Sequence, residues 1–260
     1  MIVARGLRYT HPGTPAGTPP ALDGADFAVP PGALLCLCGV NGSGKSTLLQ
    51  LLAGLLRADA GTLDVAVPHS PGAEAVLHCP GAEAALRRHA ALVLQDADMQ
   101  MLGATVAEDL LLTAPPAHTP DGAVALAAAR EAAGRFGLAA HWDSPVHTLS
   151  YGQKRKLCLA AALLAAPGLL LLDEPFSGLD HPAALELRDI LARNRAAGLT
   201  QVVSVHELEP VVDMADLMLV LDGGRQALFG PPAAVLDRVR AHGIRPPCSW
   251  TARREIVPYE

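Results

Sequence analysis

The chain has 260 residues, half of them hydrophobic, and a formal net charge of −6. This length and apolar content suit one large α/β domain or two small ones with a substantial core. The negative charge gives no electrostatic support to general nucleic-acid binding, so we expect no nucleic-acid partner. The longest apolar stretch, 157–172, is broken by Pro167 and Gly168 and is shorter than the roughly 20 residues of a membrane-spanning helix. We therefore expect a soluble protein that reaches a membrane only through a partner.

The predicted elements alternate between strands and helices. Short strands flank a Pro- and Gly-rich loop at 11–20, a loop-rich insert is expected at 65–82, and no internal repeat is evident. The other elements are, in chain order, a strand at 33–38, a helix from Leu48, a strand at 92–94, helices at 104–113, at 121–140 and from Ser150, a strand at 169–172, a helix at 182–197 and a strand at 201–205. This alternation predicts a mostly parallel sheet.

The cysteine and histidine residues do not indicate a structural metal site. Five cysteines without an evident export signal favour reduced thiols in a cytoplasm. Cys36 and Cys38 are two apart on one predicted strand, so both should lie on one face as small buried apolar residues. The segment 69–89 contains several histidines and Cys79, but its spacing matches no zinc pattern.

A glycine-rich segment joins the strand at 33–38 to the helix that follows it. Residues 39–47 read Gly-Val-Asn-Gly-Ser-Gly-Lys-Ser-Thr, a complete phosphate-loop pattern. Glycines let backbone N–H groups converge on phosphate oxygens, and the helix N-terminus adds a partial positive charge. Lys45 can reach the β- and γ-phosphates, and the Ser46 hydroxyl can ligate Mg²⁺. The predicted nucleoside-triphosphate site comprises Gly39, Asn41, Gly42, Ser43, Gly44, Lys45, Ser46 and Thr47.

Further motifs follow the phosphate loop in an informative order. The apolar strand at 169–172 ends in Asp173, placed to hold Mg²⁺ through its water shell, and Glu174, placed to polarise an attacking water. Upstream, Leu-Ser-Tyr-Gly-Gln at 149–153 opens a helix. Ser-Gly-Leu-Asp at 177–180 follows the acidic pair, and His206 directly follows an apolar strand.

Together these motifs resemble the nucleotide-binding domain of ABC ATPases over about residues 1–235. The resemblance implies an α/β fold: a P-loop NTPase core of the RecA-like, mostly parallel type, with an antiparallel β subdomain. A helical subdomain would be inserted at about 96–165, and residues 236–260 would form a short C-terminal tail. The phosphate loop alone indicates only a P-loop NTPase, whereas the 149–153 motif ahead of the acidic strand is highly specific.

The same resemblance implies roles for individual residues around ATP and Mg²⁺. Asp173 would be the Walker B acid and Glu174 the catalytic base, while His206 would be the switch histidine that contacts the γ-phosphate. Gln95 matches the glutamine that senses Mg²⁺ and water and contacts the transport partner. These assignments predict a hydrolytic site rather than a site for binding alone.

Other residues would act across a dimer. Ser150, Gly152 and Gln153 would cap the γ-phosphate of the ATP held by the opposite subunit, and Asp180 would close across the same dimer. Such sites are composite, so one subunit should hydrolyse ATP poorly alone. Taken singly, Ser150 and Asp180 are also good N-caps for the helices that follow them.

Two positions depart from the family pattern. Tyr151 stands where the signature usually has its first glycine, and because tyrosine rarely adopts a positive φ, the backbone there must use ordinary angles. The usual adenine-stacking aromatic is replaced by His11. Either the His11 imidazole would stack on the base, or Tyr9 would do so in another register. A solvated loop histidine and an ordinary strand tyrosine are the structural alternatives.

The segment that starts at Gln95 indicates which class of ABC ATPase to expect. Residues 95–102 (Gln-Asp-Ala-Asp-Met-Gln-Met-Leu) and 104–109 are similar to the Q-loop region of cobalt, nickel and energy-coupling-factor importers. Ala97 replaces the usual proline, and Met101-Leu102 replaces the usual Leu-Phe. The resemblance implies an ATPase subunit that powers import of a transition-metal ion (cobalt or nickel) or a vitamin. An exporter ATPase, or a soluble ABC ATPase outside transport, is the alternative.

The resemblance also implies partners and a location. A second ABC ATPase subunit, identical or different, would complete the dimer. A multi-span transmembrane coupling protein and a substrate-binding membrane subunit would complete the transporter. The chain would then sit peripherally on the cytoplasmic face of the cell membrane.

Overall fold

The structure, a computed structural model, describes residues 1–70, 73–79, 81–114 and 122–259, with the side chains of 67–70 and 73–78 outside the description. Its strands are β1 (Ile2–Tyr9), β2 (Leu22–Val29), β3 (Leu34–Cys38), β4 (Ala60–Ser70), β5 (Ala73–Cys79), β6 (Ala90–Val93), β7 (Leu169–Leu172), β8 (Thr200–Val205), β9 (Leu217–Asp222) and β10 (Arg225–Gly230). Its helices are α1 (Lys45–Leu52), α2 (Glu83–His89), α3 (Val106–Thr113), α4 (Ala123–Arg135), α5 (Tyr151–Leu164), α6 (His181–Ala196), α7 (Pro232–Val235) and α8 (Cys248–Arg253). Short 3-10 turns are η1 (Ala97–Met99), η2 (Ala139–His141), η3 (Val146–Thr148) and η4 (Val239–His242).

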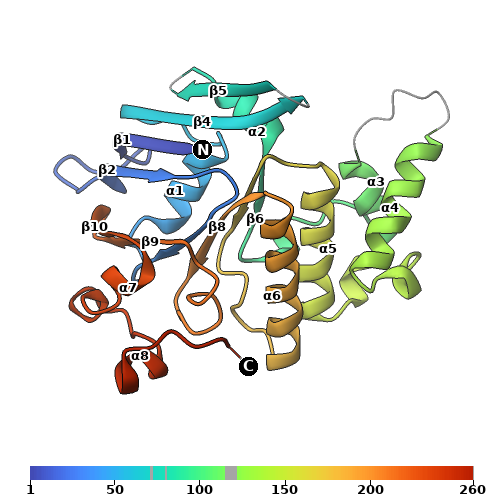
Figure 1. Ribbon diagram of the computed structural model, residues 1–260. Coiled ribbons are helices and arrows are strands. Elements are labelled where there is room, and N and C mark those ends of the chain that lie inside the picture. Colours follow the sequence, from blue (N-terminus) through green and yellow to red (C-terminus); the bar gives the residue numbers. More distant parts are fainter. Residues whose placement is uncertain (71–72, 80, 115–121, 260) are drawn as a thin grey trace.

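Two sheets organise the molecule (Figure 1). The larger sheet has the strand order β10-β9-β3-β8-β7-β6, in which all neighbours are parallel except the β9–β10 pair. The smaller, antiparallel sheet has the order β2-β1-β4-β5. The predicted α/β fold with a mostly parallel sheet is confirmed. Because the carboxyl ends of parallel strands meet at one sheet edge, the loops after β3, β6, β7 and β8 assemble there.

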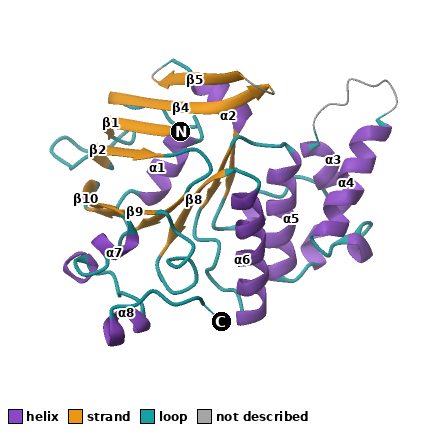
Figure 2. Cartoon of the chain, in the orientation of Figure 1, coloured by secondary structure: helices purple, strands orange, loops and turns teal. Residues whose placement is uncertain are grey.

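The large sheet is covered on both faces (Figure 2). Apolar side chains of α5 and α6 pack on one face, and α1 packs on the other, where it also contacts the antiparallel sheet. Cys36 and Cys38 of β3 lie on the α5 face and are fully buried, as predicted. A hydrogen bond to Cys38, together with burial, raises the pKa of the Cys36 thiol. Burial likewise raises the pKa of Cys158 to about 12, so the thiols of Cys36 and Cys158 are neutral apolar groups.

The loop-rich insert expected at 65–82 is wrong, because β4 continues to Ser70 and β5 follows from Ala73 to Cys79. Strand β1 pairs with β4 as far as Val65, and Met1 extends this pairing through backbone hydrogen bonds with Ala66. Beyond Ala66, β5 is the one strand that pairs with β4 among the described residues. Pro68 therefore lies where β4 has one neighbouring strand, a position at which a missing N–H is tolerated. The candidate metal segment at 69–89 falls largely on side chains outside the described residues.

The helices around residues 104–164 lie at one end of the molecule, where α3, α4 and α5 pack against one another (Figure 1). Of the helix predicted at 121–140, residue 121 lies outside the described part, and α4 ends at Arg135. Gly137 follows in the left-handed conformation (φ 69°), which ends the helix, and η2 comes next. No helix in the described ranges is long and apolar enough to span a membrane.

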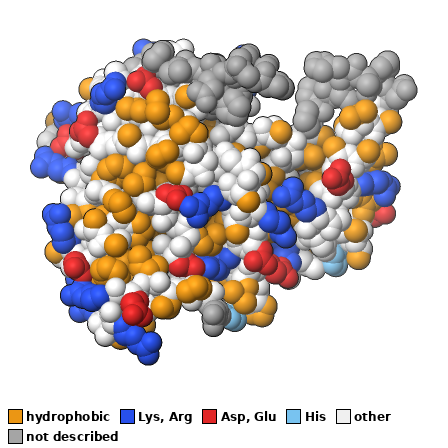
Figure 3. Space-filling view, viewed as in Figure 1, with side chains coloured by type: hydrophobic (Ala, Val, Ile, Leu, Met, Phe, Trp, Pro, Cys, Tyr) orange, Lys and Arg blue, Asp and Glu red, His pale blue; other side chains and the backbone are white. Residues whose placement is uncertain are grey.

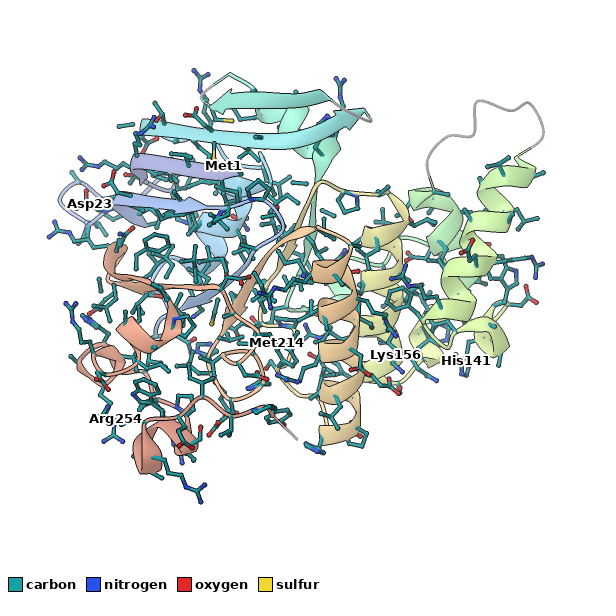
Figure 4. All side chains as sticks on the ribbon, in the orientation of Figure 1. Met1, Asp23, His141, Lys156, Met214 and Arg254 are labelled. Carbon is teal, nitrogen blue, oxygen red and sulfur yellow. The ribbon has the colours of Figure 1, made fainter. Side chains whose placement is uncertain are left out.

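Charged side chains of both signs are intermixed on the face that carries α5 and α6 (Figure 3). Lys156 of α5, labelled in Figure 4, forms an ion pair with Glu186 of α6. The chain after α7 also packs on the core, because Val239 and Trp250 are buried in it. The Trp250 indole N–H donates to Asp237 at 2.8 Å. These contacts fix the C-terminal segment against the large sheet.

Candidate functional site

The phosphate loop connects the end of β3 to the start of α1. A Cβ atom at Gly44 would lie 2.5 Å from the carbonyl oxygen of Ala21, and one at Gly39 would lie 2.4 Å from that of Leu221. Gly44 also caps α1 in the left-handed conformation (φ 102°). Only glycine fits these two positions. Gly44 has no side chain that could accept a hydrogen bond from the first N–H groups of α1, so no side-chain cap occupies the helix start.

A cleft of about 750 Å³ opens above this loop. It is lined by residues from the loops that follow β1, β3, β6, β7 and β8 and from the first turn of α1: His11, Ala21, Asn41, Gly42, Ser43, Gly44, Lys45, Ser46, Thr47, Gln95, Glu174, Ser177 and His206. The structure thus brings together most of the residues predicted to hold or hydrolyse a triphosphate. Gly39 does not line the cleft itself, but its carbonyl oxygen accepts a hydrogen bond from the ammonium of the lining residue Lys45 at 2.9 Å.

The Glu174 carboxylate is the polar centre of the cleft. Its Oε1 lies 2.6 Å from His206 Nε2 and 3.7 Å from Lys45 Nζ. Its Oε2 accepts a hydrogen bond from Gln95 Nε2 at 3.0 Å. Lys45, Gln95 and His206, which come after β3, β6 and β8, therefore converge on the Glu174 carboxylate, which comes after β7. This carboxylate can accept a proton from water, and the surrounding donors can stabilise negative charge.

A buried serine, which the sequence analysis missed, supports both acidic residues. Ser204 Oγ donates to Asp173 Oδ1 at 2.6 Å and accepts from the Glu174 backbone N–H at 2.8 Å. Glu174 has a φ of 48°, a costly angle for a residue other than glycine that persists only when neighbours hold it. The sequence does contain a signal for this residue, because Ser204 is the one hydroxyl in the apolar run Val202–Val205. A polar group buried in such a strand needs a hydrogen-bond partner.

The residues of the cleft fit a nucleoside triphosphate. Lys45 is only 5% exposed, so its charge is poorly solvated and favours a bound anion. The buried Ser43 hydroxyl has no hydrogen-bond partner in the described structure. The loop N–H groups, Lys45 and Thr47 would hold the phosphates. The chemistry that this arrangement supports is attack of water on a terminal phosphate, with Glu174 as the base.

The structure distinguishes His11 from Tyr9. Tyr9 is 6% exposed and belongs to the core beneath the antiparallel sheet, so its ring face is not available to a ligand. His11 is exposed at the cleft, and its Nε2 lies 3.3 Å from Thr47 Oγ1. The Tyr9 ring meets the imidazole edge-on at 5.0 Å between centroids. Of the two residues, His11 has the position for stacking on a base.

Replacing His11 by alanine should weaken ATP binding by about fivefold, because one aromatic contact contributes roughly 1 kcal/mol. His11→Trp should bind ATP at least as tightly as the unchanged protein, since it enlarges the stacking surface. Titration with a fluorescent ATP analogue measures both variants. Equal affinities for the alanine, tryptophan and unchanged proteins would show that the base does not stack here.

The signature residues do not line the cleft of their own chain. Ser150 N-caps α5 in a capping box, in which Gln153 Oε1 accepts from the Ser150 N–H at 2.8 Å. Gln153 Nε2 lies 2.9 Å from Nε2 of His141, which is labelled in Figure 4. Asp180 N-caps α6 by accepting from the Ala183 N–H at 3.0 Å. Gly152 follows Tyr151 in the first turn of α5. Within one chain, Ser150 and Asp180 thus act as helix caps.

Tyr151 adopts ordinary backbone angles, as predicted. It is the first residue of α5 and is not among the non-glycine residues with a positive φ. Its position in the helix explains why glycine is not required there. The signature segment keeps its serine at the helix start.

Comparisons with known proteins agree with this geometry. The ABC transporter family model matches residues 22–177. The chain is similar to the cobalt import ATP-binding protein CbiO of Rhodobacter capsulatus, with 39% identity over 250 residues, covering 95% of this chain and 85% of that protein. It is also similar to the nickel import ATP-binding protein NikO of the same organism, with 36% identity and 90% of each chain covered.

A solved structure matches over most of the chain. The structure of cbiO1 from Clostridium perfringens, described as part of the ABC transporter complex cbiONQ, has a TM-score of 0.75 and 28% identity. The match covers 92% of each chain. The family match extends over more than half of the chain and includes both the phosphate loop and the acidic strand. The chain therefore belongs to the ABC transporter family, as an ATP-binding subunit whose ATP hydrolysis is coupled to transport.

Proposed function

We propose that this subunit powers an importer of the energy-coupling-factor type, for a transition-metal ion such as cobalt or nickel, or for a vitamin. The observation that carries the proposal is the segment 95–109, which follows the edge strand β6 and resembles the corresponding segment of such importers, apart from Ala97 and Met101-Leu102. The cobalt and nickel import proteins among its relatives support this assignment.

Side-chain hydrogen bonds fix the first part of this segment. Gln100 Oε1 accepts from the Leu94 N–H at 2.9 Å, and Gln100 Nε2 donates to the Leu92 carbonyl at 3.3 Å. The Asp96 carboxylate accepts from the Asp98 N–H at 3.0 Å. These bonds hold η1 against the end of β6, directly after the cleft residue Gln95. A displacement of this segment would therefore also move Gln95 in the cleft.

The same segment presents apolar side chains to solvent. Met99 is 75% exposed and Leu102 is 78% exposed. Asp109 Oδ1 accepts from the N–H groups of Leu102 and Gly103 at 2.7 and 3.0 Å, so the backbone that carries Leu102 is held in place. Exposed apolar side chains that gather in one patch can form a contact site for a partner. We assign this surface to the transmembrane coupling protein, which would hold the chain at the cytoplasmic face of the membrane.

The second partner in the proposal is another ABC ATPase subunit. Ser150, Gly152 and Gln153 do not line the cleft of their own chain, which fits a site completed by the signature of a second subunit. Two ATP molecules would lie between two such subunits, and burial of their phosphates would favour the closed dimer. Asp180, at the start of α6, would contact the opposite subunit. Hydrolysis would then reopen the dimer.

Within each site the chain's own residues would divide the work of hydrolysis. Glu174 would accept a proton from the attacking water, while His206 and Gln95 would orient the water and the γ-phosphate. Ser46, Gln95 and Asp173 carry oxygen atoms of the kind that Mg²⁺ prefers and would hold it. When bound, Mg²⁺ supplies positive charge to the phosphate oxygens.

Affinity capture of the full chain from detergent-solubilised membranes of its own cells should recover a multi-span membrane protein. Leu102→Glu should lose that partner and keep ATP binding, because a charge at the contact is costly to bury. Leu55→Glu is the matched control, since Leu55 is 54% exposed and lies after α1. Capture of soluble proteins alone, or equal capture by both variants, would contradict the proposal.

The direction and cargo of transport need a separate measurement. Cells that carry Glu174→Gln as their only copy should take up less radioactive cobalt or nickel than cells with the unchanged chain. Lower vitamin uptake, with metal uptake intact, would select the vitamin alternative. Faster loss of a preloaded solute from unchanged cells than from variant cells would indicate an exporter instead.

A further inference from the structure

The side chain of Tyr151 connects the start of α5 to the turn that follows the acidic pair. Its hydroxyl donates to the carbonyl oxygen of Ser177 at 3.3 Å. Arg155 Nη2, one helical turn later, donates to the same hydroxyl at 2.6 Å and to the same carbonyl at 3.3 Å. The Arg155 guanidinium also lies 5.2 Å from the centre of the tyrosine ring. Three groups therefore share one closed hydrogen-bond arrangement.

The turn is shaped to accept this ring. Gly178 has a φ of 73°, and a Cβ atom there would lie 3.3 Å from Cε1 of Tyr151. A side chain at 178 would thus be strained and would press on the ring. Arg155 is only 6% exposed, and its Nε and Nη1 have no hydrogen-bond partner in the described structure. The buried guanidinium therefore makes its side-chain hydrogen bonds through Nη2, to the tyrosine hydroxyl and the Ser177 carbonyl. The contact between Tyr151 and the turn is a packed one, although Tyr151 is 44% exposed.

The other side of the turn reaches the general base. The Ser177 N–H donates to the carbonyl oxygen of Glu174 at 3.1 Å. Two consecutive hydrogen bonds therefore join the Tyr151 hydroxyl, through the Ser177 peptide groups, to the backbone of Glu174. That backbone has a φ of 48°, so its conformation depends on contacts of this kind. Ser204 holds the N–H side of Glu174, and the 177 turn holds its carbonyl side.

We propose that Tyr151 is a positioning residue that couples the two ATP sites of a dimer. Its hydroxyl ties the turn of its own general base to the helix start at Ser150, which serves the nucleotide of the opposite subunit. This coupling rests on the two-site dimer proposed above. When the partner's ATP engages Ser150, the resulting shift of α5 reaches Ser177 and then Glu174. One subunit thereby senses the nucleotide held by the other.

Tyr151→Phe is the test, because it removes the hydroxyl and keeps the ring over Gly178. ATP hydrolysis by the unchanged protein should show a Hill coefficient above one, and the variant's coefficient should fall toward one. Its kcat should fall about fivefold, as expected for one lost hydrogen bond near the reacting group. Its KM for ATP should change by less than about twofold, because the phosphate-binding residues are untouched.

Thr251→Val is the matched control, since its hydroxyl also accepts a hydrogen bond from an arginine, Arg240 Nη2 at 3.2 Å, in the C-terminal segment and outside the path from Tyr151 to Glu174. It should retain both kcat and the Hill coefficient. A Hill coefficient of one in the unchanged protein, or an unaltered coefficient and kcat in Tyr151→Phe, would overturn the coupling.

The dimer itself is tested separately, by ATP-dependent association of Glu174→Gln with Tyr151 intact. Failure of that association contradicts the proposed dimer. Success there, with no effect of Tyr151→Phe, contradicts only the role of Tyr151.

Discussion

Glu174→Gln should bind ATP with near-normal affinity, lose ATP turnover by roughly 10²- to 10⁴-fold, and accumulate as an ATP-bound dimer. The amide keeps the size of the carboxylate but cannot accept a proton from water. In the unchanged protein, Gln95 Nε2 and His206 Nε2 lie 3.0 and 2.6 Å from the Glu174 carboxylate. The substitution leaves these two donors without a charged acceptor. Phosphate-release assays measure the turnover, and size-exclusion chromatography with and without ATP measures the dimer.

Glu255→Gln provides the control for charge alone, because Glu255 is exposed in the C-terminal segment. It should retain turnover and show no ATP-dependent dimer beyond that of the unchanged protein. Near-normal hydrolysis by Glu174→Gln would remove the base assignment. The carboxylate would then act only to hold Lys45 and His206 before nucleotide binds.

Lys45→Ala should lower the affinity for ATP by about tenfold to a hundredfold, the effect of removing one or two charge-assisted hydrogen bonds to phosphate. Lys45 Nζ now donates to the carbonyl oxygens of Gly39 and Val40 at 2.9 and 3.4 Å and lies 3.7 Å from Glu174. The ammonium is therefore already held over the loop by backbone oxygens. A direct binding titration measures the loss without requiring turnover.

Lys156→Ala is the matched control, since it removes a lysine that is paired with Glu186 on the α5–α6 face. Its ATP affinity should be unchanged. Lys45→Met tests whether the loop needs the aliphatic part of the side chain, and thermal unfolding without nucleotide shows whether each variant is folded. Tight ATP binding by folded Lys45→Ala would contradict the phosphate-loop assignment.

The parts of the site that lie on one short segment could be predicted from the sequence. The phosphate loop and the strand ending in Asp173 each combine an apolar strand with residues of known chemistry, and the structure places both at the same sheet edge. The glycines of the loop were informative because their backbone approach excludes a Cβ. Local spacing was sufficient for these residues.

Contacts between distant segments could not be predicted in the same way. The bond from Ser204 to Asp173 spans 31 residues, and the bond from Tyr151 to Ser177 spans 26. The first depends on the register that places β7 beside β8, and the second on how α5 packs beside the turn after β7. The hairpin of β4 and β5 was missed for a related reason, since Pro68 looks like a strand breaker unless the neighbouring strands are known.

The position of each strand in the large sheet has a mechanical consequence for the cleft. Strand β3, which leads to the phosphate loop, is fully buried and pairs with β8 and β9. Strand β6, which leads to Gln95, is partly exposed and lies at the sheet edge, where β7 is its one neighbour among the described strands. Local opening takes less free energy at a sheet edge than at a buried centre. We therefore expect the cleft to deform more easily on the Gln95 side, where the chain continues to Met99 and Leu102. A bound triphosphate would be held mainly from the phosphate-loop side, which is the more rigid one.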